Sequence, residues 1–109
     1  MYTVTKRLTI SASHHLCLSY DSPCSQVHGH NWEIVLYFRS ETLNENGMVI
    51  DFAHVKQTVE ELMDHKNLNE VFDFNPTAEN IAYHLVNLFP CAYKCEVIES
   101  TNNTASYER

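Results

Sequence analysis

Alternation of polar and apolar residues dominates the first forty positions of the chain. Over residues 2–14 one face is mainly apolar and ends in a histidine, with Lys6 as the clear exception, while the other face carries mostly hydroxyl side chains. Residues 28–40 repeat the alternation, with two histidines and Trp32 leading the apolar face. A two-residue period is typical of half-buried strands. We therefore expect two strands here, paired antiparallel.

Helical periodicity takes over after a turn at "NENG", residues 44–47. Asp51 is the expected cap of a helix that runs to about His65, and Thr77 is the expected cap of a second helix that Pro90 ends. The apolar faces of the two helices are expected at Phe52, Val55, Val59, Leu62 and Met63, and at Ile81, Ala82, Leu85, Leu88 and Phe89.

Two more strands are expected at the end of the chain. One covers roughly residues 93–100, and "ASYER" forms a short last strand after a turn at "TNN". The third strand is expected to place Tyr93, Cys95, Val97 and Glu99 on one face. The order ββααββ predicts an α+β fold: a four-stranded antiparallel sheet with both helices on one face, in a single domain spanning 1–109.

Composition narrows the classes of partner. The chain has 109 residues and a formal net charge of −7, which disfavours nucleic acid and anionic membranes as partners. No apolar run is long enough to cross a bilayer, and the first ten residues show no signal-peptide features. We therefore expect a cytoplasmic protein, in which the four cysteines are reduced thiols.

Three histidines are expected to meet at one end of the sheet. His14 ends the inner face of the first strand, and His28 and His30 begin the inner face of the second. Antiparallel pairing places these ends side by side. Three neutral imidazoles suit Zn²⁺ and leave a fourth position open for water or substrate, as in catalytic zinc sites. Packing of three buried histidines is the alternative, but it requires a partner for each ring nitrogen.

Other chemically capable residues lie near these histidines in sequence. Cys24 could complete a closed, structural Cys/His zinc site, an alternative to the open one. Asp64 and His65 could form a proton-transferring pair or simply a solvated helix end. Glu99 is a carboxylate on an otherwise inward-facing set of positions. It could be an exposed edge residue or an anchor for paired N–H groups of a ligand.

Six segments, in this order, give the chain a family resemblance over nearly its whole length. They are "ISASHHL", "CSQVHGHNW", "GMVIDFAHVK", "MDHKNLN", "NPTAENIA" and "VIESTNNTASY". The chain resembles the 6-pyruvoyl-tetrahydropterin synthase and 6-carboxy-tetrahydropterin synthase family. The resemblance implies a tunnelling fold (T-fold), in which three subunits join their sheets into a barrel and two trimers stack into a hexamer.

The resemblance also implies roles for individual residues. It implies zinc on His14, His28 and His30, a catalytic thiol at Cys24, and a catalytic partner pair at Asp64 and His65. It implies that Glu99 holds the pterin ring, with Thr77 nearby, and that the active site lies between subunits.

The spacing of Cys24 from the His-Gly-His sequence separates the branches of the family. Three residues lie between Cys24 and His28. This spacing resembles the 6-carboxy-tetrahydropterin synthases of the queuosine (7-deazaguanine) pathway. The implied reaction converts 7,8-dihydroneopterin triphosphate to 6-carboxy-5,6,7,8-tetrahydropterin, acetaldehyde and triphosphate. The alternatives are a 6-pyruvoyl-tetrahydropterin synthase and a non-catalytic, zinc-stabilised module that binds a pterin or a partner protein.

Overall fold

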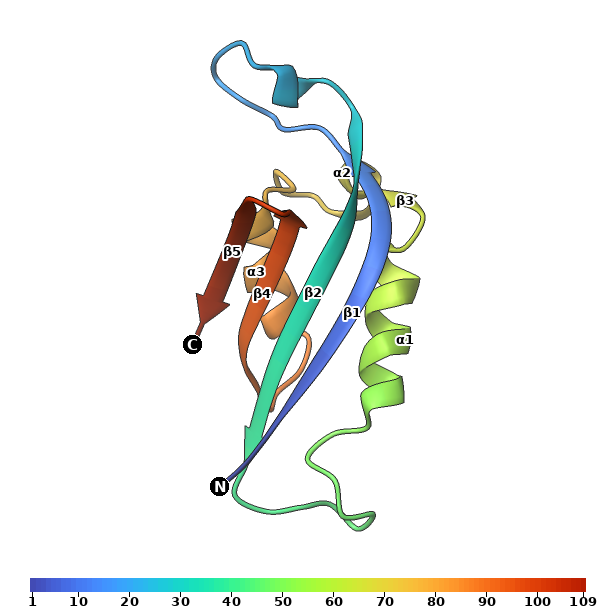
Figure 1. Cartoon of the computed structure of the whole chain (residues 1–109), viewed down its shortest axis with the longest axis vertical. Coiled ribbons are helices and arrows are strands. Elements are labelled where there is room, and N and C mark those ends of the chain that lie inside the picture. Colours follow the sequence, from blue (N-terminus) through green and yellow to red (C-terminus); the bar gives the residue numbers. More distant parts are fainter.

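Two long strands form the centre of the computed structural model, which describes residues 1–109 (Figure 1). β1 (Tyr2–His14) pairs antiparallel with β2 (His28–Ser40) over their whole length. β4 (Ala92–Ser100) adds antiparallel to β2, and β5 (Asn103–Glu108) adds antiparallel to β4. The expected α+β class and the four long strands are therefore confirmed.

The expectation of a four-stranded, purely antiparallel sheet is wrong. A fifth strand, β3 (Lys66–Asn67), pairs parallel with β1 and makes the order β3-β1-β2-β4-β5. β3 has two residues, too few to show any period in the sequence. It forms because the backbone turns sharply after the first helix: His65 has a positive φ of 58°, and its N–H donates to the Ser11 carbonyl of β1 at 2.6 Å.

Both longer helices pack on one face of the sheet; in Figure 1, α3 lies behind β4 and α1 lies beside β1. α1 (Phe52–Met63) is capped by Asp51, whose carboxylate accepts from the Ala53 N–H. α3 (Ala78–Val86) is capped by the Thr77 hydroxyl. A third helix, α2 (Leu68–Val71), was not expected, so the order ββααββ is also incomplete. The fully buried side chains of this layer include Trp32, Ile34, Leu36, Phe38, Val55, Val59, Met63, Leu68, Ile81 and Leu85.

Several boundaries and faces differ from the expected ones. α1 ends at Met63, two residues before His65, and Leu88 lies beyond α3 and is 38% exposed. Tyr93 points away from the helices, because a bulge opposite Tyr37 and Phe38 shifts the register of β4. The Tyr93 ring consequently lies by Tyr37, with centroids 6.1 Å apart.

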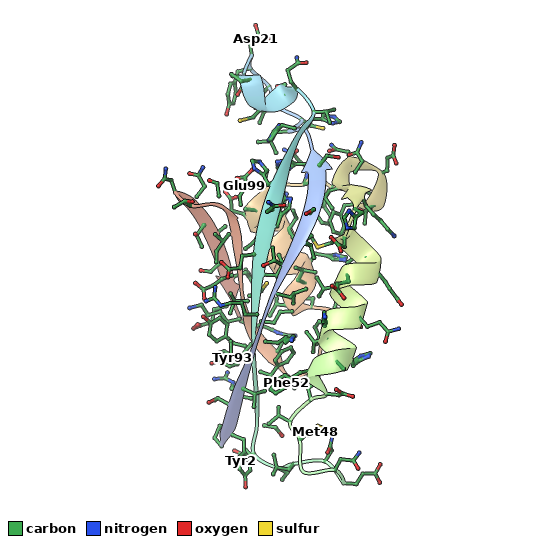
Figure 2. The ribbon with its side chains drawn as sticks, turned by 45° about the vertical axis from the view of Figure 1, so that its right-hand side comes forward. Tyr2, Asp21, Met48, Phe52, Tyr93 and Glu99 are labelled. Carbon is green, nitrogen blue, oxygen red and sulfur yellow. The ribbon has the colours of Figure 1, made fainter.

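The molecule is long and narrow, 51 × 26 × 24 Å. Figure 2 shows Tyr2 and Met48 at one end and Asp21 at the tip of a loop at the other end, with Glu99 below that loop. The loop joins β1 to β2 and contains the short 3-10 helix η1 (Pro23–Ser25). No helix is long and apolar enough to cross a membrane. The end that carries the loop also carries the histidines.

Candidate metal centre and active site

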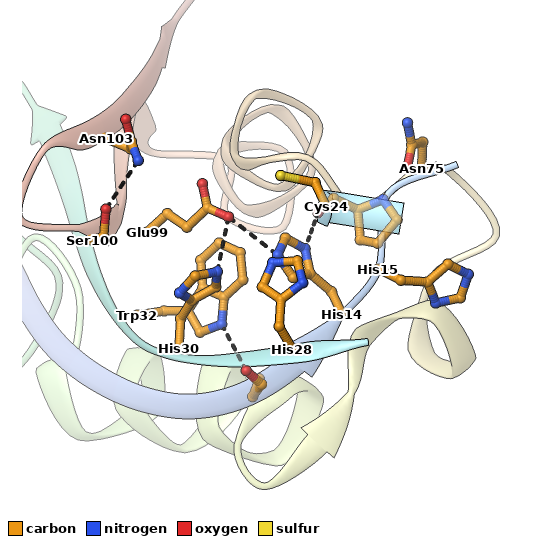
Figure 3. A network of polar contacts seen from close by, with 12 residues as sticks. His14, His15, Cys24, His28, His30, Trp32, Asn75, Glu99, Ser100 and Asn103 are labelled. Atoms are coloured by element: carbon orange, nitrogen blue, oxygen red, sulfur yellow. Dashed lines mark hydrogen bonds and ion pairs between the residues drawn. The ribbon is translucent and has the colours of Figure 1, made fainter. Parts of the chain in front are cut away.

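The structure brings His14, His28 and His30 together at the end of the β1–β2 ladder. His14 pairs directly with His28, and His30 pairs with Ala12. The rings of His28 and His30 lie 4.6 and 5.3 Å from the ring of His14, between centroids. Figure 3 shows the three rings grouped beside Glu99. Period-two alternation on two paired strands places all three on one face.

Backbone carbonyls fix the orientation of two of these rings. His14 Nδ1 lies 2.8 Å from the Pro76 carbonyl, and His28 Nδ1 lies 2.7 Å from the Gln26 carbonyl. A carbonyl only accepts, so each Nδ1 carries the proton and each Nε2 keeps a lone pair. Such a contact at the far nitrogen is common in metal-ligating histidines.

The nitrogens that face the centre of the cluster lack hydrogen-bond partners. His14 Nε2 and His30 Nε2 are both buried and unpaired. Burial is the main cause that lowers the pKa of His14, and the neighbouring histidines lower it further, so the ring is neutral. A buried unpaired nitrogen costs free energy unless something occupies its lone pair. These nitrogens therefore fit a metal ion better than they fit packing alone.

Trp32 forms the apolar wall beneath the cluster. It is fully buried, and its ring centroid lies 4.8 Å from that of His14 and 5.2 Å from that of His30. Its indole N–H donates to the Ala12 carbonyl at 3.1 Å, which holds the ring in place. This wall restricts the rotamers of both histidines from the core side.

Glu99 joins the cluster from β4. Its Oε1 lies 3.1 Å from both His14 Nε2 and His30 Nε2. One ligand atom from each of the three histidines and Glu99 lies within 4.8 Å of the others, and these four residues could together hold a metal ion. Sequence reasoning placed Glu99 on the inner face but did not bring it to the histidines.

Cys24 is not a member of this four-residue group. It lies on η1, and its side chain is exposed. The Leu16 N–H donates to the Cys24 carbonyl at 2.8 Å, which holds the loop back toward the end of β1. All four cysteines are free thiols. The group that could hold a metal is thus complete without a thiolate.

Asp64 and His65 are fixed to β1 through one residue, Ser11. The Ser11 N–H donates to Asp64 Oδ1 at 2.9 Å, and the Ser11 carbonyl accepts from the His65 N–H. The other carboxylate oxygen of Asp64 lies 3.7 Å from His65 Nε2. The His65 side chain is 83% exposed, so its ring faces solvent in the single chain. This pairing gives the imidazole a carboxylate neighbour, as proton-transferring histidines commonly have.

An open pocket of about 480 Å³ is lined by both His30 and His65. The other residues around it are mostly polar and include Lys66, which is the only Lys or Arg side chain there. Thr77 does not line this pocket, and its hydroxyl is engaged as the cap of α3, accepting from the Asn80 N–H at 3.1 Å. The neighbouring Pro76 carbonyl, by contrast, holds His14.

Sequence reasoning missed the residues that orient the expected site. The carbonyls of Pro76 and Gln26 and the backbone of Ser11 act through main-chain atoms, so their residue types carry no signal. Trp32 does have a sequence signal, because it occupies the next inward-facing position of β2 after His30.

Comparison with known proteins identifies the family. The sequence model for 6-pyruvoyl tetrahydropterin synthase matches residues 3–109. The human protein named 6-pyruvoyl tetrahydrobiopterin synthase is 32% identical, over 96% of this chain and 90% of its own. The Synechocystis protein named 6-carboxy-5,6,7,8-tetrahydropterin synthase is 30% identical, over 98% of this chain and 93% of its own. A putative 6-carboxy-5,6,7,8-tetrahydropterin synthase from Pyrococcus horikoshii is 44% identical, over 50% of this chain and only 34% of its own length.

Solved structures agree with the sequence comparison. The 6-pyruvoyl tetrahydropterin synthase of Caenorhabditis elegans superimposes with a TM-score of 0.78 at 26% identity, covering 99% of this chain and 95% of that one. The Plasmodium falciparum protein of the same name shares the fold, with a TM-score of 0.64 at 15% identity, covering 98% of each chain. With the matched sequence model and the clustered histidines, these likenesses show that the chain belongs to the 6-pyruvoyl tetrahydropterin synthase family, whose members are lyases.

Proposed function

We propose that the protein is a zinc-dependent lyase of queuosine (7-deazaguanine) biosynthesis. Its substrate is 7,8-dihydroneopterin triphosphate, which with one water gives 6-carboxy-5,6,7,8-tetrahydropterin, acetaldehyde and triphosphate. The observation that carries the proposal is the meeting of His14, His28 and His30, together with the exposed thiol of Cys24, which three residues separate from His28. Relatives named for the 6-carboxy product in Rickettsia bellii and Synechocystis support this branch.

The metal that the family implies fits the residues present. His14 and His30 offer buried, unpaired Nε2 atoms, and His28 has its Nδ1 committed to a carbonyl. Neutral imidazoles suit Zn²⁺. When bound, zinc supplies Lewis acidity that lowers the pKa of the side-chain hydroxyls of the substrate.

The proton transfers are assigned to groups of the chain. The exposed thiol of Cys24 is the group that moves a proton at the side-chain carbon beside the pterin ring, since the thiolate is the reactive form of cysteine. His65, oriented by Asp64, transfers the complementary proton. The Ser11 backbone keeps this pair in register with β1 and therefore with His14 at its end.

Substrate recognition is assigned to Glu99, with Thr77 nearby. The Glu99 carboxylate can accept two N–H groups from the aminopyrimidine edge of the pterin. Its side chain is 22% exposed, so a ligand can reach it. Thr77 contributes by capping α3, which keeps the Pro76 carbonyl against His14.

Assembly completes the proposal. His65 is exposed and lies outside the metal group, and the family resemblance implies that the Asp–His pair serves the thiol of a neighbouring subunit. We infer a homo-oligomer, a trimer or a dimer of trimers, that works in the cytoplasm. A net charge of −7 supports neither a nucleic acid nor a membrane as partner.

A 6-pyruvoyl-tetrahydropterin synthase is the second candidate, favoured by the 32% identity to the human protein of that activity. It would eliminate triphosphate from the same substrate and release no acetaldehyde. A non-catalytic module that holds a pterin or a partner protein is the third. Incubation of the zinc-loaded protein with 7,8-dihydroneopterin triphosphate, followed by mass spectrometry of the products, separates the three. The 6-carboxy product is expected, the 6-pyruvoyl product would move the protein to the other branch, and unchanged substrate would contradict a lyase.

A further inference from the structure

Glu99 approaches the histidines without hydrogen bonding to them. Its Oε1 is 3.1 Å from Nε2 of His14 and of His30, yet neither nitrogen makes a hydrogen bond. An in-line N–H···O contact would have satisfied them. Ligand atoms of Glu99 and of all three histidines lie within 4.8 Å of one another, and Figure 3 shows these side chains grouped. That arrangement is expected of ligands around an ion rather than of an ion pair.

The spacing of these atoms matches a tetrahedral metal site. Ligands about 2.0–2.1 Å from Zn²⁺ at tetrahedral angles lie about 3.3 Å from one another. The distances of 3.1 Å from Glu99 Oε1 to His14 Nε2 and to His30 Nε2 are close to this separation between ligand atoms. We propose that Glu99 is the fourth protein ligand of the resting metal centre, and that substrate must displace it to reach the metal.

The anchoring of the four residues decides which ligand leaves. His14 and His28 are held by the Pro76 and Gln26 carbonyls, and His30 packs against Trp32. Glu99 makes no other side-chain contact that orients it, and it lies next to the last residue of β4, before an exposed turn at residues 101–102. Its 22% exposed side chain can swing out, whereas the histidines cannot.

Displacement gives Glu99 two uses in one cycle. As a ligand it closes the position that catalytic zinc sites leave open, so the resting centre is protected. Once released, the carboxylate is free to accept the N–H groups of the pterin, a step that rests on the proposed function. Metal binding by Glu99 does not depend on that function and is tested separately.

The test is the zinc affinity of Glu99→Gln, measured without substrate by competition with a chromophoric chelator. Gln keeps the shape of the side chain but replaces the carboxylate by a weaker ligand. Affinity is expected to fall at least as much as on loss of an outer-shell partner, on the order of 10- to 100-fold. The control is Glu79→Gln, which removes an equal charge from a residue that lines the same pocket as Glu99. The control is expected to stay within about twofold of the native affinity.

A second variant and a second measurement distinguish the loss of a metal ligand from misfolding. Glu99→Asp keeps the charge but shortens the side chain, so it is also expected to weaken zinc binding if contact is what matters. Thermal unfolding of each metal-free variant checks the fold first. In the cobalt(II)-loaded proteins the visible spectrum is expected to change in both Glu99 variants and not in the control. Native affinity and native spectra in both variants would overturn the proposal, whatever the lyase assay shows.

Discussion

His14 and His28 are direct cross-strand partners, the last residue of β1 facing the first residue of β2, with ring centroids 4.6 Å apart. The geometry of the candidate metal centre is therefore set by the register of one antiparallel ladder. A slip of one residue would turn either histidine to the opposite face of the sheet. The ladder runs the full length of both strands, so the core that they bury also fixes the site.

Replacing Cys24 with alanine separates a catalytic thiol from a metal ligand. Because Cys24 lies outside the four-residue group, zinc content and oligomeric state are expected to be unchanged in Cys24→Ala. Activity is expected to fall on the order of 10²- to 10⁴-fold, the usual contribution of a positioned acid or base. Zinc analysis and steady-state rates measure the two effects.

Cys17→Ala is the matched control for this variant. Cys17 is another exposed thiol in the same loop, so its loss is expected to leave the rate nearly unchanged. Full activity in Cys24→Ala would contradict the catalytic assignment, and loss of zinc would favour a structural Cys/His site.

Sedimentation at micromolar concentration tests the assembly. β5 is an edge strand whose residues are almost all exposed, and β3 leaves the other edge nearly uncovered. If these two edges paired between neighbouring subunits, no unpaired strand edge would remain exposed. The expected mass is that of a trimer or a dimer of trimers, and a monomer would contradict an active site shared between subunits.

Protonation of His84 is expected to make the folded protein less stable in mild acid. Burial lowers its pKa, Asp73 partly opposes this, and the ring packs 5.0 Å from Phe72 and 5.5 Å from Phe74, between centroids. The folded state thus prefers the neutral ring, while the unfolded chain takes up a proton near pH 6.5. The neutral His84 ring therefore contributes its full share to the free energy of unfolding above about pH 6.5. This contribution is lost as the pH falls from about 6.5 toward the lower pKa of the folded state.

The check is the free energy of unfolding of the metal-free protein from pH 7.5 to 5. In His84→Phe it is expected to fall less steeply with decreasing pH than in the native protein. Parallel curves for the two proteins would rule out this contribution of His84.

Cys95 is expected to be chemically inert. It is fully buried, and burial raises its pKa to about 12, so the thiolate that reacts with alkylating agents is scarce. Brief treatment of the native protein with iodoacetamide at pH 8 is expected to label exposed Cys17 but not Cys95. Mass spectrometry of the peptides reads out both sites, and rapid labelling of Cys95 before unfolding would show that its segment opens.

Much of the fold follows from the sequence because its signals are local. The alternation around Trp32 predicts which face of β2 is buried, and the capping groups of Asp51 and Thr77 mark where α1 and α3 begin. His14 and His30 could be placed together because two paired strands leave one arrangement of their inward faces.

The remaining features depend on contacts between distant segments. The approach of Glu99 to His14 requires the register of β4 on β2, in which Ile98 pairs with Glu33. β3 depends on the left-handed backbone of His65, which nothing in the residue type requires. The position of Glu99 determines whether the fourth metal position is filled, and residue types and spacing predict neither that position nor β3.

The most direct test of the account is acetaldehyde release from 7,8-dihydroneopterin triphosphate, measured as zinc is titrated into metal-free protein. Acetaldehyde is expected to form in equal amount with triphosphate, at a rate that rises with zinc and levels off near one ion per chain. His28→Ala, which removes one member of the metal group, is expected to shift this curve to much higher zinc. Triphosphate release without acetaldehyde, or a rate that is independent of zinc, would contradict the account.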